Sequence, residues 1–108
     1  MANPIKAFKL KSGEEIVAEV TNEVMGTTRT VAYTLRNPHV ISIGPTPSGR
    51  MGLVMVPWML SNQGLESLTL PIDALMFEPF DPSSDTETQF LKITSVVQLV
   101  SPGTRISS

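Results

Sequence analysis

The segment from Phe8 to Val20 constrains the fold more than any other part of the chain, because apolar and polar residues alternate on both sides of a single glycine. Before Gly13, Phe8 and Leu10 fall on one face of a strand, and after it the alternation resumes through residues 15–20. This pattern is typical of a β-hairpin with one buried face. An opening hairpin of this kind predicts a small, strongly bent β-sheet domain.

The composition indicates one domain that can bury a modest core, since the chain has 108 residues. It has no cysteine, which excludes disulfides and thiolate metal sites and fits a reducing compartment. The first residues lack the apolar region of a secretory signal, and no apolar run reaches the roughly 18 residues of a membrane span. We therefore expect a cytoplasmic protein that does not contact a membrane.

The charge is low and unevenly spread. A net charge of −2 argues against a strongly basic nucleic-acid-binding protein. Residues 1–50 nevertheless hold six basic against four acidic residues, whereas residues 51–108 hold two against six. The first half therefore carries either an ordinary scatter of surface charge or a weakly positive patch used in binding.

Strand-like segments follow one another along the chain, separated by turn residues. We expect strands at residues 5–10, 15–21, 28–35 and 39–43, a further strand within the uncharged stretch 51–65, and strand-like segments at 65–70 and 72–77 with a kink at Pro71 between them. A polar loop is expected at residues 22–27, and the step Asn37-Pro38 should form an edge, bulge or bend, because proline cannot donate to a ladder. Five or six short strands with such turn spacing predict a barrel or a sandwich.

The stretch from Met51 to Leu65 contains no charged residue and is apolar on both strand faces. A strand of this kind is buried on both faces. In a domain of this size, one of the two faces could be buried by another subunit.

Residues 84–99 are predicted to form an amphipathic helix at the end of the domain. Ser84 and Glu87 match a capping box, and apolar residues follow at helical spacing. The many β-branched residues leave a final strand from Thr94 to Val100 as an alternative. The whole chain, residues 1–108, is then one domain with a barrel over residues 5–78.

The alternation also predicts the residues of the hydrophobic core. They are Phe8, Leu10, Ile16, Ala18, Val20, Val31, Tyr33, Ile41, Ile43, Val54, Val56, Trp58, Leu68, Leu70, Phe90 and Val97.

The sequence offers little for catalysis. His39 is its only histidine, and no acidic cluster has the spacing of metal ligands. No serine lies in a nucleophile elbow, and no glycine-rich segment matches a phosphate loop. We therefore expect a protein that is not an enzyme and needs no metal or cofactor. His39 is expected at the surface or rim, where its imidazole could alternatively stack on a base.

The run from Phe8 to Val20, FKLKSGEEIVAEV, resembles the start of the first conserved motif of Sm and Sm-like (LSm) proteins. Gly13 occupies the position of the turn glycine. Leu35 to Ile41 is similar to the end of the same motif, with Asn37 at the asparagine position. The opening hairpin, the Asn-Pro step and the Pro57-Trp58-Met59 segment look like those of small Sm-like proteins of marine phages.

The resemblance covers about residues 5–70 and implies a five-stranded, strongly bent barrel of the all-β class that assembles into a homo-oligomeric ring of about five to seven copies. In such rings the fourth and fifth strands of neighbouring subunits pair edge to edge. This arrangement would bury the uncharged stretch from Met51 to Leu65. A chain of phage origin would act in the host cytoplasm.

The resemblance further implies that single-stranded nucleic acid, RNA rather than DNA, binds at the pore. The loop after the second strand supplies Arg36, Asn37 and His39, and the loop between the fourth and fifth strands supplies Asn62 and Gln63. Arg36 would contribute charge or stacking, and the asparagines would bond base edges. Alternatively, each asparagine is a turn residue that bonds its own backbone.

Two functions from different classes remain open. The first is a ring that binds single-stranded nucleic acid and acts in RNA or DNA processing. The second is a phage structural or assembly protein that makes only protein–protein contacts. The acidic balance favours the second function. So does the turn Ser61-Asn62-Gln63-Gly64, because the second conserved motif of Sm-like proteins has an Arg-Gly pair in the loop before the last strand and this turn lacks the arginine. An enzyme or small-ligand barrel has almost no support among the residues.

Overall fold

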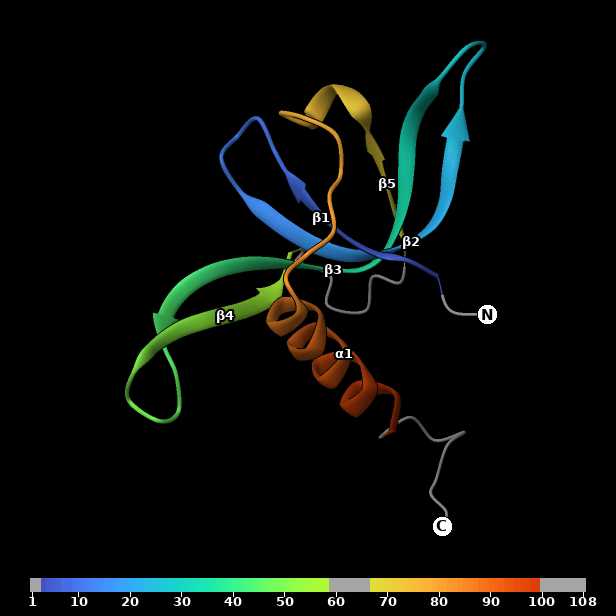
Figure 1. The fold of residues 1–108 in the computed structure, drawn as a ribbon. Helices are drawn as coiled ribbons and strands as arrows, with labels where there is room; N and C mark the ends of the chain where they lie inside the picture. Colours follow the sequence, from blue (N-terminus) through green and yellow to red (C-terminus); the bar gives the residue numbers. More distant parts are fainter. Residues whose placement is uncertain (1–2, 59–66, 100–108) are drawn as a thin grey trace.

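The computed structural model describes residues 3–58 and 67–99. Figure 1 shows a mainly β protein, in which a five-stranded antiparallel sheet is followed by one helix. The elements are β1 (Ile5–Lys9), β2 (Glu15–Met25), β3 (Thr30–Pro45), β4 (Met51–Pro57), β5 (Leu68–Pro71), a 3₁₀ turn (Ile72–Ala74) and α1 (Ser84–Leu99). The predicted all-β class with a C-terminal helix is confirmed. In the part of the chain that the structure describes, no helix has the length and apolar character needed to cross a membrane.

The first hairpin forms as its alternation predicts. Its turn closes where the Gly13 N–H donates to the Leu10 carbonyl at 2.9 Å and the Leu10 N–H donates to the Glu14 carbonyl at 2.8 Å. Gly13 has a φ of +105°. L-residues rarely adopt this conformation, so the turn requires glycine at this position.

β3 is a single long strand where two strands, 28–35 and 39–43, were predicted, and of the alternatives given for Asn37-Pro38 the bulge is confirmed. Opposite it, β2 pairs Val17 with His39 and Glu19 with Arg36, so that two residues of β3 face one residue of β2. This is a β-bulge, and it accommodates Pro38 without ending the strand. Asn37 lies in the bulge with a φ of +55°, a conformation that asparagine tolerates better than most residues. The predicted loop at 22–27 is also wrong, because β2 continues to Met25.

The two halves of β3 have different neighbours. Residues 32–35 pair with β5, whereas residues 39–45 pair with β4. Only the first half therefore belongs to the part of the sheet that curls back toward β1.

The segment after β5 closes the sheet. Ala7 and Phe80 exchange backbone hydrogen bonds of 2.8 and 3.0 Å, and the Met76 N–H donates to the Lys9 carbonyl at 2.8 Å. Residues 74–80 thus run along the free edge of β1 as two isolated bridges, where a regular strand over 72–77 was predicted. The circuit from β1 through β2, β3 and β5 back to β1 closes like a small barrel.

The core lies inside this closed part. Its buried members are Phe8, Leu10, Ile16, Ala18, Val20, Leu35, Leu70 and Leu75. Phe8 is fully buried and meets the Tyr33 ring edge-on, with 5.8 Å between ring centroids. The closed part therefore has a packed interior.

Several core predictions are wrong. Val31, Ile43 and Val56 are exposed, while Val17 and Leu35, which were not predicted as core, are fully buried. The bulges between β2 and β3 change which face each side chain takes, and the exposed Ile43 and Val56 lie beyond the closed part. The side chain of Val97 lies outside the described residues.

The helix α1 spans Ser84–Leu99, as predicted, so the alternative of a strand over 94–99 is wrong. Its cap lies one residue earlier than the predicted capping box. The Thr86 N–H donates to Ser83 Oγ at 3.2 Å, and the Glu87 N–H donates to the Ser83 carbonyl at 2.9 Å. The β-branched Thr94 is accommodated because its hydroxyl donates to the Phe90 carbonyl at 3.0 Å.

Candidate interaction surface

The β3–β4 hairpin projects beyond the closed part of the sheet (Figure 1). We call residues 42–57 the arm. From Ser42 to Pro45, β3 pairs with β4 and with no other strand among the described residues. A two-stranded ribbon cannot bury its own faces. The arm therefore depends on its surroundings for burial.

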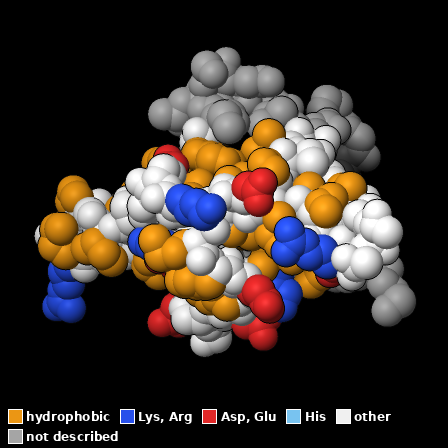
Figure 2. Space-filling view, turned by 90° about the horizontal axis from the view of Figure 1, so that it is seen from above, with side chains coloured by type: hydrophobic (Ala, Val, Ile, Leu, Met, Phe, Trp, Pro, Cys, Tyr) orange, Lys and Arg blue, Asp and Glu red, His pale blue; other side chains and the backbone are white. Residues whose placement is uncertain are grey.

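Large apolar side chains of the arm are exposed. Ile43 is 67% exposed, Met51 69% and Val56 41%. Figure 2 shows hydrophobic side chains gathered over the arm at the left end of that view. The prediction that this uncharged stretch is buried on both faces does not hold within one copy of the chain, and residues 59–65 of the stretch lie outside the described residues.

The outer edge of β4 carries backbone groups that do not bond β3. The Trp58 N–H donates to the Pro38 carbonyl and the Thr46 N–H donates to the Arg50 carbonyl, at 3.0 and 2.9 Å. Because alternate residues of an antiparallel pair bond each other, even-numbered residues of β4 bond β3 and odd-numbered ones face outward. The outward-facing Leu53 carbonyl accepts the Gln89 side chain of α1 at 3.2 Å, in agreement with this assignment.

Three predicted nucleic-acid ligands lie in the middle of β3, whereas the prediction placed them in a loop after the second strand. Arg36 is exposed, with Glu19 as its cross-strand neighbour. Asn37 follows it in the bulge. Arg36 and Asn37 are thus brought together near the surface.

His39 is turned inward, so its prediction as a surface or rim residue is wrong. It is 9% exposed, and its ring meets the Phe90 ring of α1 edge-on at 5.7 Å. Its Nδ1 lies 2.7 Å from the Asn37 carbonyl oxygen. A carbonyl can only accept, so Nδ1 carries the proton. His39 thus joins the bulge of β3 to the helix.

The remaining predicted ligands, Asn62 and Gln63, lie outside the described residues. Four of the six basic residues of the first half lie at or near the hairpin turns, which Figure 1 shows pointing in different directions. Lys9 ends β1 and Lys11 lies in the first turn, Arg29 lies in the second and Arg50 in the third, whereas Lys6 and Arg36 lie within strands. This distribution favours a scatter of surface charge.

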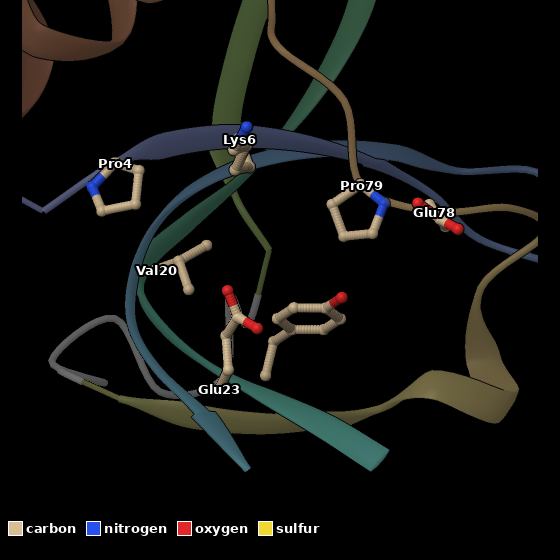
Figure 3. Close-up of a pocket in the computed structure, with 7 residues that line it drawn as sticks. Pro4, Lys6, Val20, Glu23, Glu78 and Pro79 are labelled. Atoms are coloured by element: carbon tan, nitrogen blue, oxygen red, sulfur yellow. The ribbon is translucent and has the colours of Figure 1, made fainter. Parts of the chain in front are cut away.

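A hollow of about 180 Å³ opens at another place in the molecule, where β1, β2 and β3 meet the segment before α1 (Figure 3). It is lined by Pro4, Lys6, Val20, Glu23, Tyr33, Glu78 and Pro79. Burial, together with the Glu23 and Glu78 carboxylates, raises the pKa of the Tyr33 phenol above its usual 10.0. The sequence analysis missed this site because its residues come from distant segments and Tyr33 was assigned to the core.

No protein-family model matches the sequence, and no curated protein matches it either. The resemblance to Sm-like proteins therefore stays a prediction, based on the residues quoted for it.

Proposed function

We propose that this protein is a non-enzymatic, self-associating barrel of Sm-like type that assembles into a ring of about five to seven copies. The opening hairpin with its Gly13 turn supports this proposal. So does the way in which the last segment, residues 74–80, returns to β1 after a 3₁₀ turn. The helix α1 is C-terminal, so it would be an addition to such a barrel.

The observation that carries the proposal is the arm. Ile43, Met51 and Val56 are exposed beside a strand edge whose outward groups pair with no other strand of the described residues. A monomer that leaves apolar surface next to an open strand edge is prone to association. A second copy of the chain would cover both the apolar side chains and the edge.

The mass in solution tests this assembly. We expect light scattering on a sizing column to give about five to seven times the 11.7 kDa of one chain. A monomer at concentrations well above the micromolar range would overturn the proposal.

A matched pair of methionines locates the contact. Met51 lies in the arm and Met25 at the end of β2, and the two are similarly exposed, at 69% and 63%. We expect Met51→Lys to dissociate the oligomer, because the interface would have to bury an unpaired ammonium group. Met25→Lys should leave the mass unchanged. Equal effects of the two substitutions would exclude the arm as the contact.

We further propose single-stranded nucleic acid, RNA in preference to DNA, as the ligand of the ring, with a role in RNA or DNA processing. The support is the exposed Arg36 next to Asn37 at the bulge of β3. An arginine and an amide at one point of the surface can contact a phosphate or base edge of an unpaired strand.

Fluorescence anisotropy with labelled uridine-rich RNA and the matching DNA tests this ligand. We expect binding that weakens with salt and falls about fivefold or more in Arg36→Ala, while Arg29→Ala, a change of another exposed arginine, has little effect. An oligomer that binds neither strand would overturn the nucleic-acid proposal and favour a protein of phage structure or assembly that makes only protein contacts.

A further inference from the structure

The hollow at Tyr33 is lined by apolar side chains and by two acidic residues, Glu23 and Glu78. Figure 3 shows Pro4, Val20 and Pro79 around it, with the Glu23 carboxylate rising from β2 toward the space between them. Glu23 and Tyr33 are cross-strand neighbours in the β2–β3 ladder, so the strand register holds them side by side.

The charges around the hollow do not cancel. Lys6 is the only cation in its lining, and its Nζ is bound to Asp81 Oδ1 at 2.6 Å. In Figure 3 the Lys6 ammonium group points away from Glu23. Within the described residues, Glu23 accepts a single long hydrogen bond, 3.3 Å from the Thr30 hydroxyl. The lining therefore keeps unused acceptor capacity on Glu23 and Glu78.

We propose that this hollow binds the guanidinium or ammonium head of a small cationic ligand. This site lies away from the arm, so it does not depend on the proposed assembly. The head group would lie against the Tyr33 ring and donate to the Glu23 carboxylate, and its short alkyl chain would contact Val20 and the two prolines.

The dimensions and chemistry favour a small head group. A volume of about 180 Å³ is enough for a guanidinium with a chain of two or three carbons. A neutral ligand of the same shape would gain the apolar contacts but no charge-assisted hydrogen bond. An anion would be repelled by the negative charge of Glu23 and Glu78 in the lining.

N-ethylguanidinium is a suitable probe, and its neutral, planar analogue N-ethylurea is the matched control ligand. Tyr33 is the only tyrosine of the chain, so the ring resonances of one residue report on the site in an NMR titration of the whole protein. We expect N-ethylguanidinium to shift these resonances with a Kd of about 1 mM, typical of one head group on a half-open site, and N-ethylurea to leave them in place.

Two variants test the role of the carboxylate. Glu23→Gln keeps the shape of the side chain and its contact with Thr30, and we expect it to weaken binding about tenfold. Glu87→Gln, in the first turn of α1 and absent from the lining, should leave the affinity unchanged. Equal shifts with both ligands, no shift at all, or equal affinity of the two variants would each overturn the proposal.

The same titration distinguishes the two sources of such a head group. Nα-acetyl-arginine amide carries it on a peptide-like backbone, whereas N-ethylguanidinium is a free small molecule. Binding of both with similar affinity supports the side chain of a protein partner. Binding of N-ethylguanidinium alone supports a free cation, because the hollow would then exclude a peptide backbone.

Discussion

The closed part of the sheet and the arm share strand β3, yet their apolar side chains differ in how far they are buried. The first half of β3 lies between β2 and β5 and contributes the fully buried Leu35 to the core. The last residues of β3, 42–45, pair only with β4 among the described strands and leave Ile43 exposed. Both halves have strand-like, apolar sequences, so local propensity does not separate them. The number of neighbouring segments decides which half can bury its side chains.

The largest expected effect comes from removing a core side chain of the closed part. Phe8→Ala should lower the free energy of unfolding by about 3–5 kcal/mol, because it leaves a cavity where a fully buried ring meets Tyr33. Ile43→Ala in the arm should cost less than about 0.5 kcal/mol in the isolated chain. Urea denaturation at one fixed protein concentration measures both. Similar losses in the free energy of unfolding for the two variants would show that the closed part and the arm do not differ in burial.

A pair of turn glycines sharpens the comparison further. Gly13 has a φ of +105° and Gly49, at the tip of the arm, a φ of +87°, and a Cβ atom added at either position meets no atom within 4 Å. Backbone strain of about 1–2 kcal/mol is therefore expected in both alanine variants.

The two variants should nevertheless differ in what unfolds. We expect Gly13→Ala to lower global stability, whereas Gly49→Ala should increase hydrogen exchange in the arm and leave the amides of β1 and β2 protected. Loss of protection throughout the chain in Gly49→Ala would show that the arm and the closed part unfold as one unit.

The helix α1 contacts β3 through Phe90 and β4 through Gln89. A substitution at its cap therefore tests how much the helix contributes to the stability of the sheet. Ser83→Ala removes the side-chain acceptor of the Thr86 N–H and should cost about 1 kcal/mol. Ser84→Ala, one residue later and exposed, is the matched control and should change little. Urea midpoints at equal protein concentration provide the measurement, and equal shifts would mean that Ser83 is not the cap.

The smallest expected effect concerns pH and is confined to the closed part, which contains the only tyrosine. The pKa of Tyr33 is raised, so the folded chain holds the phenol proton more tightly than the unfolded chain. The resulting stability is complete below the usual value of 10.0 and is lost as the pH rises through the raised pKa. Tyr33→Phe should therefore lose less stability than the parent between pH 8 and pH 11, as measured by urea midpoints. A steeper loss in the variant would contradict the direction of the shift.

Local patterns predicted the features that depend on neighbouring residues. The alternation around Gly13 predicted the first hairpin, and the helical spacing predicted α1 with its observed bounds. The cap was misplaced by one residue because Ser84 matches the capping box with Glu87, whereas the observed hydrogen bond runs from the Thr86 N–H to Ser83.

Features that depend on distant segments could not be predicted in this way. A bulge was one of the forms predicted for Asn37-Pro38, but the continuity of β3 through it appears only when β2 is aligned with both halves of the strand. The inward position of His39 depends on contact with Phe90, and the hollow at Tyr33 combines residues that lie far apart in the sequence, from Pro4 to Pro79. No periodicity within one segment contains this information.

The pairing of Ala7 with Phe80 has a consequence for the order of events during synthesis. The first strand leaves the ribosome early, but the segment that covers its free edge follows roughly 4–15 s later at about 5–20 residues per second. Throughout that interval the first hairpin of the nascent chain has no segment paired with the free edge of β1. Contacts between residues so far apart in sequence also slow folding. The free edge of β1 can be covered only after residues 74–80 have been translated.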